Sequence, residues 1–331
     1  MSEAALGVVA VGNALVDVLA QVDDAFLDEQ CAKYGMERGA MTLIDQNRAI
    51  ELYTQMPGRL ETSGGSAANT MAGFASFGGI GAFIGKVADD ELGKTFREDM
   101  RKIGMEHMTQ PLIAGAPTGR CMILVSPDGH RTMNTYLGAS VELGPQDIEP
   151  DIIASASITY LEGYLFDKDL AKQAFIRAAE CAHISGHRVA LTLSDPFCVD
   201  RHRHDFLNLV QNHVDILFAN EEEIKSLYMQ NDFEDAKNAV NSHCEVSVLT
   251  RSEKGAVIIS EGREIVIPAV PVPKVVDTTG AGDQFAAGFL HGFTHARTLE
   301  ECGRLGAIAA AEVISHIGPR PQKSLKELVA A

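Results

Sequence analysis

DTTGAGDQFAAGFLHGF (residues 277–293) places a Gly-Ala-Gly turn, a carboxylate and an apolar run in immediate succession. A glycine turn lets neighbouring backbone N–H groups point in one direction at close range. The helix expected from about Gly282 to Phe293 adds the positive end of its dipole at the same point. Such a turn attracts anions, phosphate above all. The sequence therefore predicts an anion hole formed by Gly280, Ala281 and Gly282.

Asp283 follows this turn, where its negative charge opposes a bound phosphate. One interpretation is a carboxylate in the first helical turn that serves as a cap, which is a common arrangement. The other is a catalytic base that faces a hydroxyl group while the amides hold a phosphoryl group. The motif by itself leaves both interpretations open.

Composition narrows the class of protein. The chain has 331 residues, of which 46% are hydrophobic and 22% charged, as in a soluble globular enzyme. The net charge of −17 argues against nucleic acid or an anionic membrane as a partner. The sequence shows no membrane-spanning run or signal peptide, and its six cysteines are scattered. We therefore expect a cytoplasmic protein with small-molecule partners.

The chain from about residue 150 onward alternates short β-rich runs with amphipathic stretches. We expect strands at 156–163, 187–194, 214–219 and 246–250, and helices at 169–185 and 298–315. Buried strands separated by helices indicate βαβ units and a parallel sheet.

The first third of the chain has a different pattern. Residues 7–22 form one strand-like stretch that is too long for a single buried strand, and 63–78 read as a turn followed by a helix of small residues. Residues 118–140 contain two strands around SPDGH, a hairpin signal. We expect a small β-sheet that covers the carboxyl ends of the parallel strands, where open α/β folds bind ligands.

Other phosphate-binding and catalytic motifs are excluded. Gly85-Lys86 lacks the first glycine and the Ser/Thr of a P-loop, and no G-x-G-x-x-G fingerprint, G-x-S-x-G elbow or protein-kinase signature is present. The histidine-rich run DRHRHD (200–205) is typical of a solvated helix start rather than a metal site.

These motifs together resemble the ribokinase-like family of carbohydrate and nucleoside kinases, which includes phosphofructokinase-B. DTTGAGDQFAAGF is similar to the family's C-terminal signature, and GGSAANTMAGFASFGG (64–79) with IGKVADDELG (84–93) to its N-terminal one. NEEE (220–223) is similar to its N-x-x-E motif. The resemblance implies one ribokinase-like domain over 1–331, with a three-layer α/β core, a mainly parallel central sheet and a β-sheet lid from about 14–45 and 112–140.

Several stretches resemble the adenosine-kinase branch of the family, among them GNALVD (12–17) and LTLSDPF (191–197). Asp17 ends an apolar run, where burial is costly unless hydroxyl groups of a ligand or a basic lid residue pair with it. The resemblance implies a ribose site, whose residues would be Asn13, Asp17, Gly64, Gly65, Ser66 and Asn69. It also implies an apolar slot for a purine, formed by Leu15, Met36, Leu137, Tyr164, Phe166 and Phe197; such residues are more often plain core.

The phosphate side is likewise implied by the resemblance. Arg131 would close over the transferred phosphate, and Asn220 with Glu223 would organise Mg²⁺ through water. ATP would also contact Thr250, Gly255 and Thr279. A monovalent cation site near 277–279 is a further possibility. The family's T-x-G-x-x-G loop reads TRSEKG (250–255) here, with Ser252 in place of the first glycine, and HIGPRP (316–321) departs from the animal enzymes.

The sequence therefore predicts an ATP-dependent kinase that phosphorylates the 5′-hydroxyl of a purine nucleoside, most simply adenosine to AMP. Asp283 would act as base with an ordinary carboxylate pKa. A sugar kinase with the same base and a catalytically silent nucleotide-sensing module are the alternatives. The lid edges allow either a monomer or a lid-paired homodimer.

Overall fold

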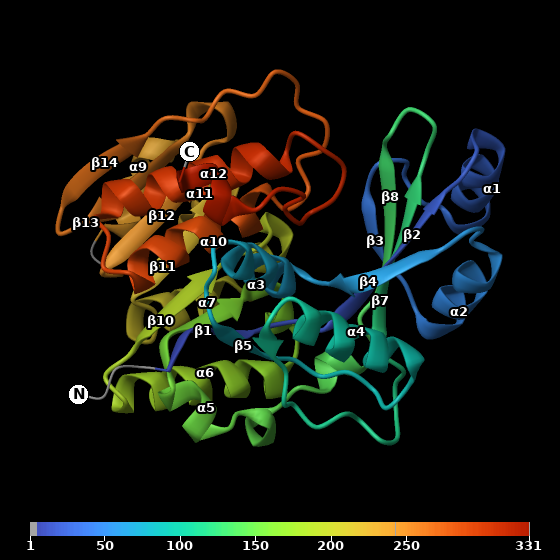
Figure 1. The fold of residues 1–331 in the computed structure, drawn as a ribbon, viewed down its shortest axis with the longest axis horizontal. Helices are drawn as coiled ribbons and strands as arrows, with labels where there is room; N and C mark the ends of the chain where they lie inside the picture. The colour runs from blue at the N-terminus through green and yellow to red at the C-terminus, as the bar shows by residue number, and fades with distance from the viewer. Residues whose placement is uncertain (1–4, 242, 331) are drawn as a thin grey trace.

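The computed structural model describes residues 5–241 and 243–330, which form two β-sheets and the helices around them (Figure 1). The larger sheet has the strand order β14-β13-β12-β11-β10-β9-β1-β5-β6. Its strands are β1 (Leu6–Val11), β5 (Gly81–Ile84), β6 (Met105–Glu106), β9 (Ala156–Glu162), β10 (Arg188–Thr192), β11 (Ile216–Asn220), β12 (Val246–Thr250), β13 (Ala256–Ser260) and β14 (Arg263–Ile267). All neighbours pair in parallel except β12–β13 and β13–β14, which confirms the mainly parallel sheet.

Helices cover both faces of this sheet. Side chains of successive strand residues point to opposite faces, so Val8 and Ala10 of β1 belong to one hydrophobic cluster and Val9 and Val11 to the other. The first cluster includes side chains of α3 (Ser66–Ser76), α4 (Glu91–Lys102), α10 (Ala281–Thr294) and α11 (Leu299–Val313). The second includes side chains of α5 (Pro150–Ala154), α6 (Asp169–Ile184), α7 (Pro196–Asn212), α8 (Glu221–Tyr228) and α9 (Phe233–Val240). The three-layer core is therefore confirmed.

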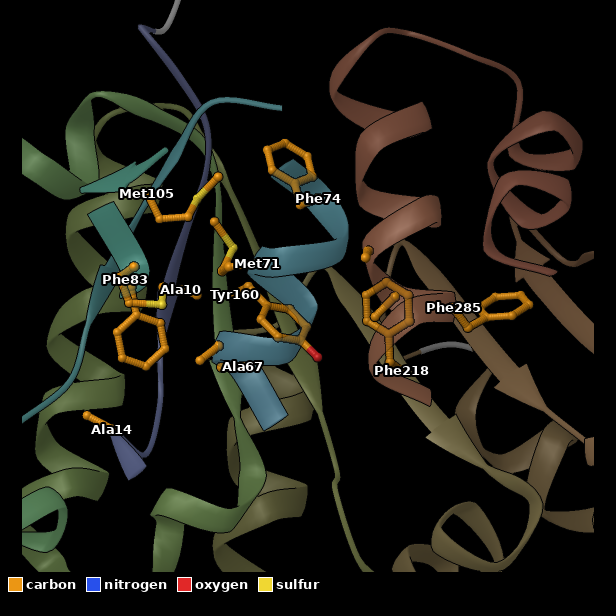
Figure 2. Close-up of a cluster of buried hydrophobic side chains, with 14 of the residues drawn as sticks. Ala10, Ala14, Ala67, Met71, Phe74, Phe83, Met105, Tyr160, Phe218 and Phe285 are labelled. Atoms are coloured by element: carbon orange, nitrogen blue, oxygen red, sulfur yellow. The ribbon is translucent and has the colours of Figure 1, made fainter. Parts of the chain in front are cut away.

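Figure 2 shows part of the first cluster, where Met71 of α3 meets Phe83 of β5 and Tyr160 of β9. The rings of Tyr160 and Phe218 meet edge to face, with centroids 6.1 Å apart. This packing fixes α3 against the sheet, and with it the turn that precedes α3. The short helix α12 (Leu325–Ala330) adds Leu325 to a satellite cluster with Phe77.

The second sheet has the order β3-β8-β7-β2-β4 and lies at one end of the larger sheet (Figure 1). Its strands are β2 (Leu15–Gln21), β3 (Met41–Leu43), β4 (Leu60–Gly64), β7 (Gly119–Val125) and β8 (Arg131–Tyr136). The helices α1 (Asp24–Tyr34) and α2 (Gln46–Gln55) pack on one face, through Leu27 and Leu52. The other face turns toward the larger sheet, as a lid would. Short 3₁₀ turns are η1 (Gly138–Glu142), η2 (Pro145–Asp147), η3 (Gly163–Asp167) and η4 (Ser252–Lys254).

The stretch 7–22, which is too long for one buried strand, divides into β1 and β2, which belong to different sheets. Three details differ from the expectation. The lid also takes β4, which lies outside 14–45 and 112–140. The run 200–205 lies within α7, where His202 interrupts the helix at φ −124° and ψ 24°. Finally, α10 begins and ends one residue outside the expected range.

No helix in the described part of the chain combines the length and the apolar character needed to cross a membrane.

Candidate active site

A cavity of about 1020 Å³ lies between the two sheets. Its lining includes Glu162, Thr192, Asn220 and Thr250 at the carboxyl ends of β9 to β12, and residues of β2, β3, β7 and β8 from the lid. The predicted site residues that line it are Asn13, Leu15, Asp17, Gly65, Ser66, Asn69, Arg131, Leu137, Tyr164, Phe197, Asn220, Glu223, Thr250, Thr279, Gly280, Ala281, Gly282 and Asp283. The structure thus brings together residues that are more than 200 positions apart in the sequence, at the edge where the βαβ pattern predicts a ligand site.

The glycine turn begins α10 in the way the sequence suggests. Gly280 is the N-cap with φ 80°, a left-handed conformation, and an added Cβ would lie 2.6 Å from the Pro319 carbonyl oxygen. The Ala281 N–H donates to the Thr278 carbonyl. No described residue accepts a hydrogen bond from the N–H groups of Gly282 and Asp283, which lie in the first turn, where helical partners are missing. The N–H groups of Gly282 and Asp283 are therefore available to a ligand at the positive end of the α10 dipole.

Asp283 lies at this helix start and faces Ser66 of α3. The Ser66 hydroxyl donates a hydrogen bond of 2.6 Å to Asp283 Oδ1. Burial raises the pKa of Asp283 to about 7; the Ser66 hydrogen bond opposes this rise, and the charge of Glu162 adds to it. The expectation of an ordinary pKa was therefore wrong, because burial by the surrounding fold disfavours the charged form of this carboxyl group. A carboxylate that titrates near neutral pH suits a general base.

Asp17 of β2 is 8% exposed and lines the same cavity. None of the described residues donates a hydrogen bond to its carboxylate, and burial raises its pKa to about 6 against the charges of Arg320 and Arg131. Gly64 leaves it room, since a Cβ there would lie 2.2 Å from Asp17 Oδ1. A buried carboxylate without donors is unfavourable unless a ligand supplies them, so Asp17 fits paired hydroxyl groups.

Glu162 is a cavity residue that the sequence analysis did not select. Its Oε1 accepts hydrogen bonds from Asn13 Nδ2 (2.8 Å) and the Asn13 N–H (3.3 Å), and its Oε2 accepts one from the Ala67 N–H (2.7 Å). Asn13 Oδ1 also accepts a hydrogen bond from Ser140. Glu162 thus fixes Asn13 and the start of α3. Its place directly after a buried strand was the available signal.

Arg131 of β8 lies over the cavity, in an ion pair with Asp277 that joins Nη2 and Oδ2 at 3.1 Å. The contact has the distance but not the geometry of a hydrogen bond, so the buried nitrogens of this guanidinium have no hydrogen-bond acceptor among the described residues. Asp277 in turn accepts hydrogen bonds from Thr279 and the Gly318 N–H. A buried guanidinium with unused donors fits an incoming phosphate.

Asn220 and Glu223 form a reciprocal capping box at the start of α8. Glu223 Oε2 accepts from the Asn220 N–H, Oε1 accepts from Asn220 Nδ2, and the Glu223 N–H donates to Asn220 Oδ1. Burial, with the charges of Asp195 and Asp283, raises the pKa of Glu223 to about 7. Because both of its oxygens already accept hydrogen bonds, this carboxylate suits a cation held through water, and the surplus negative charge fits Mg²⁺.

The loop after β12 holds Ser252 in a backbone conformation that favours glycine. Ser252 has φ 51°, in the left-handed region that favours glycine. Gly255 follows at φ 82° and donates to the Ser252 carbonyl. Thr250 lines the cavity, whereas Gly255 does not. The serine at position 252 therefore leaves a strained turn.

The predicted apolar slot needs two corrections. Phe166 packs in the core against Phe175 and Phe206, with ring centroids 5.6 and 4.6 Å away, and does not line the cavity. Met36 is buried beside Arg48 instead. A third correction concerns the predicted ribose site: Gly64 makes room for Asp17 but does not line the cavity itself.

Two aromatic residues of the predicted slot do line the cavity. Tyr164 is 36% exposed and Phe197 is 73% exposed. Tyr164 differs from Phe166 because both belong to η3, where side chains two positions apart point in different directions.

Comparison with known proteins identifies the family. The model of the pfkB family of carbohydrate kinases matches residues 42–325. The chain belongs to the pfkB family of carbohydrate kinases. The protein is thus a phosphotransferase that acts on a hydroxyl group.

Three relatives illustrate the range of names within this family. The crystal structure of adenosine kinase from Sinorhizobium meliloti is 49% identical, with a TM-score of 0.90, and the match covers 99% of each chain. A probable sugar kinase protein from Rhizobium etli CFN 42 is also 49% identical, with a TM-score of 0.90 and coverage of 99% of this chain and 98% of that one. Adenosine kinase from Saccharomyces cerevisiae is 28% identical over 94% of this chain and 95% of its own length.

Replacing Ser252 with glycine should stabilise the protein, because a left-handed conformation is costly for a residue with a Cβ. We expect a gain of about 0.5–1 kcal/mol, which is about 1–3 °C in Tm, measured by thermal unfolding. Glu253→Gly in the same turn is the matched control, since Glu253 does not have a positive φ and should lose stability. A lower Tm for Ser252→Gly would contradict the strained turn.

Proposed function

We propose that the protein is an ATP-dependent kinase that phosphorylates the 5′-hydroxyl of a purine nucleoside, with adenosine converted to AMP. The observation that carries this proposal is a pair of carboxylates, the buried Asp17 and the half-buried Asp283, that line one cavity beside the glycine turn. One suits a pair of hydroxyl groups and the other a hydroxyl that must lose a proton. The names of two relatives reported above point to the same substrate.

The ribose would lie between the lid and α3. Asp17 would accept hydrogen bonds from two hydroxyl groups of the ribose. The Asn13 side-chain amide donates one N–H to Glu162, and its second N–H would donate to the ribose. Gly65 and Asn69 border the same part of the cavity. These contacts would direct the 5′-hydroxyl toward Asp283, and such positioning supplies much of the rate enhancement in phosphoryl transfer.

The chemical step needs one base and one anion hole. Asp283 takes the proton of the 5′-hydroxyl while the oxygen of that hydroxyl forms a bond to the γ-phosphorus of ATP. The bond between this phosphorus and the β–γ bridging oxygen breaks, and ADP leaves. The free N–H groups of Gly282 and Asp283 and the Arg131 guanidinium stabilise the charge on the transferred group.

The donor would enter from the side of β11 and β12. Thr250, Thr279 and Asn220 line that part of the cavity and carry hydrogen-bonding groups for its phosphates. Glu223 would hold Mg²⁺ through water, and when bound this ion would neutralise phosphate charge. The monovalent cation near 277–279 remains a prediction, as do the monomer or lid-paired dimer and a cytoplasmic location.

The purine would lie against apolar side chains at the lid side of the cavity, where Leu15, Leu137 and Ile123 lie. Tyr164 and Phe197 add aromatic rings, and the large exposed fraction of Phe197 leaves its ring free to stack on a flat base. A free sugar would leave these rings uncovered.

A sugar kinase is the second candidate, favoured by the name of the Rhizobium etli relative. The same base and anion hole would serve a free sugar. A silent nucleotide sensor is the third, but such a protein has no use for a base aligned by Ser66.

Assay of ATP consumption with adenosine, guanosine, inosine, ribose and fructose tests the proposal. We expect adenosine to give a kcat/KM at least about tenfold above either free sugar, because only a purine covers the apolar slot. Turnover with a free sugar alone would replace the nucleoside assignment. An absence of turnover with every acceptor would favour the sensor.

Asp283→Asn removes the base while preserving size and burial. We expect kcat to fall by about 10²–10⁴-fold, with nucleoside binding by calorimetry changed little. Asp151→Asn, at an exposed position of α5, is the control for a lost carboxylate and should leave kcat unchanged. Near-normal turnover of Asp283→Asn would refute the base assignment.

The pH profile of kcat/KM should show an acidic limb near pH 7, since the base works only when ionised and burial raises the pKa of Asp283 to about 7. Ser66→Ala removes a hydrogen bond that stabilises the ionised form, so the pKa should rise and the limb should move up by about half to one pH unit. A limb that stays in place, or moves down, would show that another group controls it.

A further inference from the structure

Arg320 reaches the acceptor side of the site from the segment between α11 and α12. Its Nε donates to Asn69 Oδ1 at 2.9 Å, and its Nη1 donates to Ser63 Oγ at 3.0 Å. Asn69 belongs to α3 and Ser63 to β4, the lid strand beside Asp17. The sequence analysis noted HIGPRP only as a departure from the animal enzymes and gave this arginine no role.

The backbone around Arg320 is held by the same helices that carry the site. The Pro319 carbonyl accepts a hydrogen bond of 2.9 Å from Gln284 Nε2, which also donates to the Asn69 carbonyl at 2.9 Å. One residue earlier, the Gly318 N–H donates to Asp277. Gln284 directly follows Asp283 in α10 and is fully buried. The position of Arg320 is therefore tied to the base and to α3.

The contact with Arg320 decides which way the Asn69 amide points. Arginine carries only donors, so the oxygen of Asn69 must face it and the amide nitrogen must face away. The nitrogen side is then free to face Asp283, and the Asn69 amide lowers the pKa of that carboxyl. Without the arginine either amide orientation becomes possible, and an oxygen turned to Asp283 would repel it.

Arg320 also brings positive charge to a region that is rich in acids. It faces Asp17 of β2, Asp99 of α4 and Asp283 of α10, and its charge lowers the pKa of Asp17. The other titratable groups that interact with Asp283 are Tyr160, Glu162, Tyr164 and Glu223, besides Asp17. All of these become more negative as they ionise, so Arg320 is a cation that opposes them from outside the cavity lining.

We propose that Arg320 is a positioning residue: it sets the Asn69 amide with its nitrogen toward the acceptor and Asp283, and it places a positive charge next to Asp17 and Asp283. This role rests on the proposed function for the identity of the acceptor. It holds for any acceptor whose hydroxyl reaches Asp283, a free sugar included.

The test compares Arg320→Met and Arg320→Lys in the full chain, with whichever acceptor the wild type phosphorylates. Arg304→Met is the matched control, since Arg304 is exposed on α11 and loses the same charge. Arg320→Met should raise the acceptor KM by about tenfold and move the acidic limb of kcat/KM up by about half to one pH unit. Arg320→Lys keeps the charge but loses the paired donors, so it should restore the limb while the KM stays raised.

A crystal structure of Arg320→Met gives a readout that needs no turnover. We expect the Asn69 side chain to leave its present position. An Asn69 that stays in place, or a KM and limb within twofold of wild type in folded Arg320→Met, would overturn the positioning role. If the wild type phosphorylates only a free sugar, the nucleoside assignment is refuted, and the same variants assayed with that sugar decide the positioning role. If the wild type shows no turnover, the crystal structure of Arg320→Met decides it.

Discussion

The buried negative charge around one cavity is the constraint on which the rest of the structure depends. Burial raises the pKa of Asp17 to about 6, and those of Glu223 and Asp283 to about 7. In each case the folded state binds a proton more tightly than the unfolded chain, so stability is lost as pH rises from the ordinary carboxylate pKa through these values. The helix start at Gly280 and the two arginines, Arg131 and Arg320, partly offset this cost.

The two sheets together bring the carboxylates of Asp17, Glu223 and Asp283 to one cavity. The large sheet provides the carboxyl ends of β9 to β12, and its helix α10 provides Asp283. The lid provides Asp17 and Arg131 from the opposite side, because β2 and β8 turn one face to the cavity while α1 and α2 cover the other. Neither sheet alone holds both the acceptor carboxylate and the base.

The sequence predicted the parts of this site that depend on local patterns. The Gly-Ala-Gly turn and Asp283 stand in one motif, and Asp17 stood out as a carboxylate in an apolar run. It could not predict the role of Arg320, which stands between two prolines in a segment without a periodic pattern. Its partner Asn69 is 251 positions away in the sequence. It misplaced Phe166, because the turn of η3 decides which ring enters the cavity, and it missed the raised pKa of Asp283, which depends on burial by the whole fold.

The same charge balance explains why local geometry must supply the affinity for a phosphate donor. A net charge of −17 repels a polyanion at long range, so favourable contacts act only within the cavity. There, Arg131 is paired with Asp277 but keeps unused donors, and Asp277 is also bonded to Gly318, two residues before Arg320. Donor-side and acceptor-side cations are therefore joined through one short segment of chain.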